Sequence, residues 1–152
     1  QMCELRARPT RLEFGEPSSL QSGWDSELAA DPDDRTIRFI VDTEGGKGKT
    51  WFQRWYKTQK GQDCQILGIG KATDLAHMID TFARVFFFNI PRGGMEFLNY
   101  SILEQLKDKV ITSGKFHSRM KYMTHNVHVW VFCNEHPDMT KLTPDRYNIT
   151  CI

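Results

Sequence analysis

The chain has 152 residues, enough for one domain with a sizeable core and too few for two. Apolar residues make up 39% and charged residues 26%, as in ordinary globular proteins, and the net charge of +1 gives no whole-chain attraction for nucleic acid or membrane. Any basic surface must therefore be local, and no apolar run approaches the ~20 residues that a membrane span needs.

Cysteine and histidine spacing indicates neither a zinc knuckle nor a disulfide framework. The four cysteines are scattered without a C-x-x-C pair, which predicts reduced, intracellular thiols. The five histidines form no convincing metal-binding set. The start, QMCELRARPT, lacks the shape of a signal peptide, and a first residue other than Met suggests a fragment of a longer protein.

Residues 1–34 are rich in Ser, Gly, Pro, Asp and Glu, and we interpret them as a linker or lead-in segment. The stretch WDSELAA, residues 24–30, predicts a short helix, and Trp24 is a candidate anchor onto the domain. The domain itself is expected to span residues 35–152.

From Thr36 onward, predicted strands alternate with predicted helices. β-Branched and apolar runs predict strands at residues 36–42, 64–69, 84–90, 127–133 and 146–152. Helical spacing of apolar residues predicts helices at residues 49–60, 72–83 and 95–108. Two short alternating segments, residues 109–116 and 119–124, predict a β-hairpin.

This alternation predicts an α/β fold with a parallel sheet and helices on both faces. In such sheets ligands bind at the carboxyl ends of the strands. The glycine-rich stretch TEGGKGKT follows the first strand and therefore lies where this architecture would place a site.

The stretch TEGGKGKT matches the phosphate-binding loop pattern G-x-x-x-x-G-K-[ST] except that Thr43 replaces the first glycine. Glycines allow the backbone to turn so that successive N–H groups converge on phosphate oxygens, and the following helix adds its positive end. Lys49 would reach the β- and γ-phosphates of ATP, and the Thr50 hydroxyl would bind Mg²⁺. The alternative is an ordinary surface turn with incidental lysines. The candidate phosphate-binding residues are Gly45, Gly46, Lys47, Gly48, Lys49 and Thr50.

Two asparagines follow buried strands further along the chain. P-loop ATPases place an acidic magnesium-binding residue after a second strand, whereas this chain has Asn89 there, and a neutral amide is a poor ligand for magnesium. Either Asn89 keeps the geometry while hydrolysis is crippled, or Glu96, Asp42 or Glu44 substitutes. Asn134 is placed to bind the γ-phosphate or to orient the attacking water. Each asparagine also has a structural interpretation, as a strand cap or a turn residue.

Residues 30–152 resemble the helicase half of replication initiator (Rep) proteins of small circular single-stranded DNA viruses, nanovirus-like and circovirus-like. The resemblance rests on VDTEGGKGKTWF, FFFNIPRGGMEFLNYSILEQLKDKVITSGKF and VHVWVFCNEHPDMTKLTPDRYNI, which occur in the order of that family. It implies a superfamily-3, AAA+-like P-loop ATPase with an inserted DNA-binding hairpin. It also implies an ATP-dependent DNA helicase that uses Mg²⁺ and acts as a homo-oligomeric, hexameric ring on single-stranded DNA.

The resemblance also assigns roles to individual residues. Gly48, Lys49 and Thr50 correspond to Walker A, Asn89 to the Walker B aspartate, and Asn134 to the sensor asparagine of motif C. Arg146 corresponds to an arginine finger that completes the ATP site of the neighbouring subunit. In the ATP site, the catalytic set would therefore be Lys49, Asn89, Asn134 and Arg146, with Thr50 and Asn89 at the metal.

The predicted hairpin carries the candidate DNA-binding residues. From the residues alone, a solvated strand edge is the favoured interpretation, because lysine commonly protects such edges. The resemblance implies instead that hairpin cations contact DNA phosphates in the central channel of a ring, with an affinity that falls as salt rises. These residues are Lys109, Lys115, Arg119 and Lys121.

The family also carries a nicking half with a histidine pair and a catalytic tyrosine, which this chain does not show. We therefore expect nicking to reside elsewhere in the parent protein, and the resemblance implies a location in the host cell nucleus. Two other functions stay open: a nucleotide- and DNA-binding oligomerisation module without turnover, and a P-loop metabolite kinase. The kinase would need an arginine lid and an acceptor pocket, and the sequence shows neither clearly.

Overall fold

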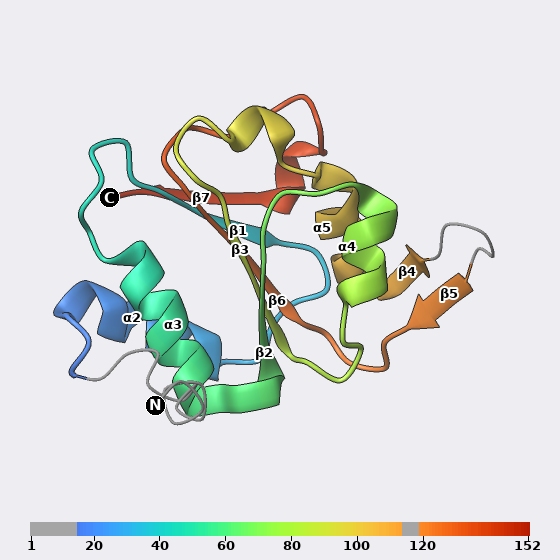
Figure 1. Cartoon of the computed structure of the whole chain (residues 1–152), viewed down its shortest axis with the longest axis horizontal. Coiled ribbons are helices and arrows are strands. Elements are labelled where there is room, and N and C mark those ends of the chain that lie inside the picture. The colour runs from blue at the N-terminus through green and yellow to red at the C-terminus, as the bar shows by residue number, and fades with distance from the viewer. Residues whose placement is uncertain (1–14, 114–118) are drawn as a thin grey trace, which may run out of the picture.

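The chain forms a five-stranded parallel sheet with helices on both faces (Figure 1), in a computed structural model that describes residues 15–113 and 119–152. The strand order is β2-β3-β6-β1-β7, so the first strand of the sequence lies inside the sheet. The strands of the sheet are β1 (Ile37–Val41), β2 (Cys64–Leu67), β3 (Val85–Asn89), β6 (His128–Cys133) and β7 (Tyr147–Cys151). The α-helices are α2 (Ser19–Ala29), α3 (Lys49–Lys60), α4 (Ala72–Met78) and α5 (Tyr100–Asp108).

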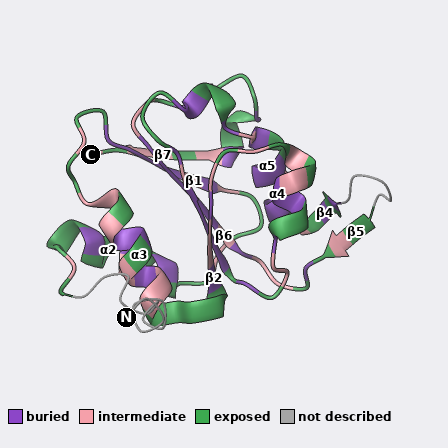
Figure 2. Ribbon diagram, in the orientation of Figure 1, coloured by how far each residue is buried: buried purple, intermediate pink, exposed green. Residues whose placement is uncertain are grey.

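The central strands are apolar because side chains on both faces are covered. In β3, Phe86 and Phe88 pack into the cluster on the side of α4 and α5, whereas Phe87 packs into the cluster on the side of α2 and α3. All three side chains are fully buried. Figure 2 shows the buried strands between the two helical layers. This arrangement explains why the strands occur as continuous apolar runs and confirms the α/β fold expected from the sequence.

The lead-in segment contributes a helix to the domain. Helix α2 begins with a capping box, in which the Ser18 hydroxyl accepts a hydrogen bond from the Gln21 N–H and the Gln21 side chain accepts one from the Ser18 N–H. Trp24 is 2% exposed and meets the rings of Phe52 and Phe132 edge-on, with centroids 5.2 and 5.7 Å away. Residues 19–29 therefore pack on the sheet, with Trp24 in the anchoring position.

Two predicted helices are shorter in the structure. The helix predicted at residues 72–83 ends at Met78, and Ile79 is extended, because the Lys121 ammonium binds the carbonyls of Ala76, His77 and Ile79 at 3.0, 2.9 and 3.1 Å.

The other helix, predicted at residues 95–108, begins only at Tyr100. The Asn99 side chain accepts a hydrogen bond from the Ile102 N–H and caps the start of α5. Before this cap the chain forms a separate 3₁₀ turn, η2 (Met95–Phe97). Two further 3₁₀ turns are η1 (Gly61–Asp63) and η3 (Pro144–Arg146).

The predicted hairpin is present outside the main sheet. Strands β4 (Val110–Ser113) and β5 (Arg119–Tyr122) pair antiparallel as a separate two-stranded sheet, and β4 packs against α4 and α5. Within residues 15–113 and 119–152, no helix is long and apolar enough to span a membrane.

Candidate functional site

The loop between β1 and α3 has a backbone that needs its glycines. Gly45, Gly46 and Gly48 have φ angles of 88°, 80° and 82°, in the left-handed region that other residues rarely adopt. At Gly48 an added Cβ would also lie 2.5 Å from the Nε2 atom of Gln21. The loop therefore has the turned backbone expected of a phosphate-binding loop, and α3 begins directly after it at Lys49.

The Asp42 side chain is hydrogen-bonded to the backbone of the loop. Its side chain is fully buried, and its carboxylate accepts hydrogen bonds from the N–H groups of Gly45 (2.8 Å) and Lys47 (3.3 Å). The Lys49 ammonium lies 3.4 Å from the same carboxylate. Burial on its own would raise the pKa of Asp42, but these hydrogen bonds and the Lys49 charge hold it below its ordinary value. The carboxylate is therefore ionised at neutral pH.

Asn89 and Asn134 lie at the same edge of the sheet as the loop. Strand β6 pairs with β1 on one side and with β3 on the other, so the three strands end together. The Nδ2 atom of Asn134 donates to the Asp42 carbonyl oxygen at 2.8 Å. The structure thus brings together the loop, the predicted sensor asparagine and the predicted Walker B position, as the parallel topology requires.

Asn89 is bound to a residue that the sequence analysis did not single out. The Oδ1 atom of Asn89 accepts a hydrogen bond from Nε2 of Gln53 at 3.1 Å, and the same Nε2 lies 3.2 Å from the Lys49 carbonyl oxygen. Gln53 is 1% exposed, and its Oε1 has no hydrogen-bond partner among the described residues. Gln53 follows Lys49 by four residues and therefore lies on the same face of α3, and this spacing could have identified it as a site residue.

Arg92 is a second residue that the sequence analysis missed. Its Nη1 donates to the Thr43 carbonyl oxygen at 3.1 Å, and its Nη2 lies 3.1 Å from the position of a Cβ on Gly45. The side chain therefore lies against the outer part of the loop and is exposed. The stretch PRGG could have identified Arg92, because it directly follows a buried strand and its arginine therefore lies at the same edge of the sheet as the loop.

The structure separates the three carboxylates considered as substitutes for a Walker B aspartate. Asp42 is buried and contacts Lys49. Glu44 is exposed on the loop, and Glu96 is exposed in η2. Across the described part of the chain, no group of three or more His, Cys, Asp or Glu side chains is placed to hold a metal ion.

The predicted DNA-binding residues differ in what they contact. The Lys121 ammonium donates to the carbonyls of Ala76, His77 and Ile79 around the end of α4, and the Lys109 ammonium donates to Asn126 Oδ1 at 2.8 Å. Arg119 is exposed on β5, whereas Lys115 lies outside the described residues. Their contact with DNA stays a prediction.

Arg146 is buried within its own chain. The residue is 4% exposed, and Nη2 lies 2.9 Å from Oδ1 of Asp108 and 3.7 Å from Oε2 of Glu104. It precedes β7, whose first residue pairs with Ile37 at the start of β1, so Arg146 lies at the opposite edge of the sheet from the loop. Within the chain the guanidinium is therefore paired through Nη2, whereas Nε and Nη1 have no hydrogen-bond partner among the described residues, and the role of Arg146 as an arginine finger stays a prediction.

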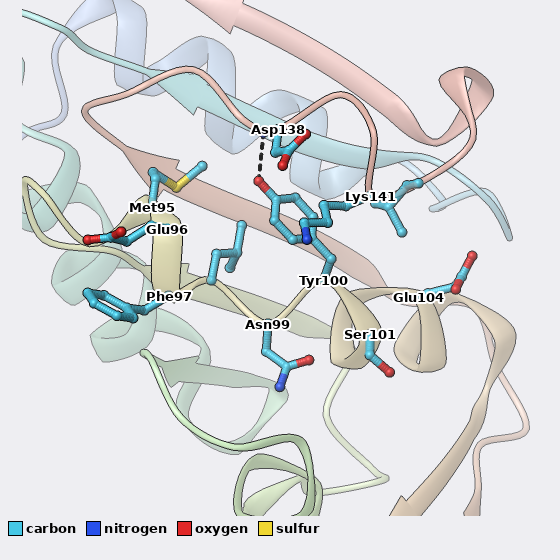
Figure 3. Close-up of a pocket in the computed structure, with 11 residues that line it drawn as sticks. Met95, Glu96, Phe97, Asn99, Tyr100, Ser101, Glu104, Asp138 and Lys141 are labelled. Carbon is cyan, nitrogen blue, oxygen red and sulfur yellow. Dashed lines mark hydrogen bonds between the residues drawn. The ribbon is translucent and has the colours of Figure 1, made fainter.

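A separate pocket of about 470 Å³ lies between the start of α5 and the segment that follows β6 (Figure 3). Its lining includes Met95, Tyr100 and Leu142, and the Tyr100 hydroxyl accepts a hydrogen bond from the Asp138 N–H at 2.8 Å. Of the residues considered for the ATP site, the lining includes Glu96, one of the three possible substitutes for the Walker B aspartate, and none of the loop residues or the two asparagines. Because the residues predicted to bind phosphate lie in and beside the loop, we take the loop as the candidate functional site.

Comparison with known proteins relates the chain to viral replication proteins. It is 37% identical over 134 residues to Para-Rep C7 of Faba bean necrotic yellows C7 alphasatellite, a match that covers 83% of this chain and 46% of that protein. It is 34% identical over 153 residues to Para-Rep C1 of Faba bean necrotic yellows C11 alphasatellite, with 92% and 51% covered. The chain therefore spans about half the length of these relatives.

The fold is also found among solved structures, whereas no family model matches the chain. The C-terminal region of NrS-1, in its A form apo structure, aligns with a TM-score of 0.51 and 9% identity over 79% of this chain and 29% of that one. At this identity the likeness concerns the fold alone. The relatives at 34–37% identity are the stronger finding, and they confirm the resemblance to Rep proteins: the chain is a homologue of the alphasatellite Para-Rep proteins.

Proposed function

We propose that the chain is the ATP-dependent helicase domain of a viral rolling-circle replication initiator. The observation that carries the proposal is the loop, in which three left-handed glycines and Lys49 lie at the carboxyl edge of a parallel sheet beside Asn134. Loop N–H groups, a lysine and a helix start together provide the donors that bind the phosphates of a nucleotide. The homology to Para-Rep proteins supports a role in DNA replication.

In this proposal the residues of the site divide the work on Mg-ATP. Lys49 and the loop N–H groups would bind the phosphates, Asn134 would contact the γ-phosphate, and the exposed Arg92 would add positive charge at the outer side of the loop. The Thr50 hydroxyl, on the exposed first turn of α3, is the protein ligand for Mg²⁺. The Asn89 amide is neutral, so most of the charge that holds the metal comes from the phosphates.

The wider assembly follows from the resemblance to Rep proteins. The domain would act on single-stranded DNA as a hexameric homo-oligomeric ring in the host nucleus, together with a nicking domain of the same parent protein. We assign a DNA phosphate contact on the hairpin to Arg119, whose side chain is exposed. The ammonium groups of Lys109 and Lys121 instead donate hydrogen bonds to oxygen atoms of the chain itself. The role of Arg146 as an arginine finger stays a prediction from the resemblance.

A second function is favoured by Asn89. An amide in place of a Walker B carboxylate suits a module that binds nucleotide and DNA and oligomerises without turnover. Gln53 holds this amide through a hydrogen bond, so the side chain has a fixed place in the site.

The variant Asn89→Asp distinguishes the two functions. We expect slow ATP hydrolysis by the unaltered protein that rises on addition of single-stranded DNA, and a rate higher by ~10-fold or more in N89D, because a carboxylate at this position helps to hold the metal. The measurement is steady-state phosphate release, with and without DNA, on protein whose assembly state is known.

Asn148→Asp is the matched control. It makes the same change of charge at an exposed position on β7, and it should leave the rate unchanged. Hydrolysis in N89D alone would favour the module without turnover. If N89D shows no hydrolysis with DNA present and rings assembled, the helicase function is contradicted.

A further inference from the structure

The loop donors that would bind a phosphate are already occupied by a carboxylate of the chain itself. The Asp42 carboxylate accepts from the Gly45 and Lys47 N–H groups and lies 3.4 Å from the Lys49 ammonium. Two of these partners are backbone donors of the glycine loop, and the third is the lysine that defines the motif. They are the groups through which such loops bind the β- and γ-phosphates of a nucleotide.

This carboxylate is held in a fixed place. Asp42 is fully buried, and its backbone is tied on both sides, since its N–H donates to the Cys133 carbonyl oxygen and its own carbonyl oxygen accepts from Asn134. Its side chain can therefore leave the loop only by rotating about its own bonds. Glu44, the other carboxylate of this segment, is exposed.

The charge of Asp42 opposes an incoming phosphate. Hydrogen bonds and the Lys49 charge outweigh the effect of burial and keep the carboxylate ionised at neutral pH. A triphosphate would need the same donors while lying within a few ångströms of this buried charge. At such distances and in a partly buried site, repulsion between like charges is strong and poorly screened.

Resting on the proposed function of the loop, we propose that Asp42 is an internal anion that competes with the nucleotide phosphates for the Gly45, Lys47 and Lys49 donors and thereby sets the affinity for nucleotide. A phosphate binds once the carboxylate has given up these partners. Asp42 is thus an affinity-determining residue, whose removal strengthens binding, in contrast to the other residues of the loop.

The variant Asp42→Asn tests this competition. The amide keeps an oxygen that accepts from the Gly45 N–H and loses the charge that holds Lys49. Calorimetric titrations with Mg²⁺ and inorganic tripolyphosphate, and with Mg-ATP, should show an affinity higher by ~10-fold or more in D42N, because one buried like charge is gone. The control, Glu44→Gln, removes the same charge from an exposed position and should change either affinity by less than ~2-fold.

A measurement on the unaltered protein covers the case in which D42N does not fold. The ¹³Cγ resonance of Asp42 should shift when the loop is saturated with tripolyphosphate, because the carboxylate loses its bonds to Lys49 and the loop N–H groups. A resonance that stays in place at saturation overturns the proposal, as does equal or weaker binding by folded D42N. If neither protein binds tripolyphosphate or ATP, the loop is not a phosphate site, and the proposed function fails together with this inference.

Discussion

Replacing Lys49 with alanine should weaken the binding of Mg-ATP by at least ~100-fold, which corresponds to about 2.7 kcal/mol. The Lys49 ammonium is directed into the loop, where it lies 3.4 Å from the Asp42 carboxylate and is 11% exposed. A charged hydrogen bond in such a place contributes about 1.5–3 kcal/mol, and this ammonium would serve two phosphates. Calorimetric titration of both proteins with Mg-ATP measures the difference directly.

The K49A experiment needs two controls. The variant leaves the buried Asp42 carboxylate without its cation, so thermal unfolding of K49A must be recorded and binding measured well below the midpoint. Lys71→Ala removes the same charge from an exposed position before α4, and its affinity for Mg-ATP should match that of the unaltered protein. Unchanged affinity in folded K49A would contradict a phosphate-binding loop and favour an ordinary surface turn.

Replacing Trp24 with alanine should lower the free energy of unfolding by about 3–5 kcal/mol, the usual cost of truncating a large buried aromatic side chain. Trp24 is 2% exposed and contacts Phe52 and Phe132 edge-on, so the substitution opens a cavity between α2, α3 and the sheet. Urea unfolding followed by far-ultraviolet circular dichroism gives the change in free energy.

Leu20→Ala on the same helix is the matched control. Leu20 is 39% exposed, so its truncation should change the free energy of unfolding by less than about 0.5 kcal/mol. A loss below about 1 kcal/mol in W24A would mean that α2 adds little to the core. The result therefore decides whether residues 19–29 behave as part of the domain or as a lead-in segment.

Much of the fold follows from local sequence patterns. Apolar runs such as VFFFN predict buried strands, and their alternation with amphipathic helices predicts the parallel sheet. That order of elements also predicts the shared carboxyl edge at which Asp42, Asn89 and Asn134 meet. These features depend on short stretches of chain, which a pattern captures.

The features that the sequence analysis missed depend on contacts between distant residues. Helix α4 ends early because Lys121 binds its last carbonyls from a hairpin more than forty positions away. Gln53 is polar on a helix whose periodicity indicates only a buried apolar face, and its partner Asn89 lies on another strand. The start of helix α2, in contrast, could have been predicted from the sequence. Ser18 and Gln21 form the S-x-x-Q pattern of a capping box.

The residue roles implied by resemblance alone had the least support from the residues themselves. Arg146 is buried with Asp108 and Glu104 at the far edge of the sheet, which a motif match does not reveal. Conversely, Asp42 lies next to the motif and outside its pattern, although its carboxylate contacts three donors of the loop. The motif therefore predicted the position of the loop, whereas the contacts of the surrounding side chains are visible only in the structure.

The central claim is that this loop binds the phosphates of a nucleotide, and glycine-selective ¹⁵N spectra recorded during a titration with Mg-ATP test it most directly. We predict that the amide resonances of Gly45, Gly46 and Gly48 shift together and saturably, and that K49A abolishes the shifts. Resonances of these three glycines that stay in place while Gly94, beside the Met95 pocket, shifts would contradict the claim and move the nucleotide site to that pocket.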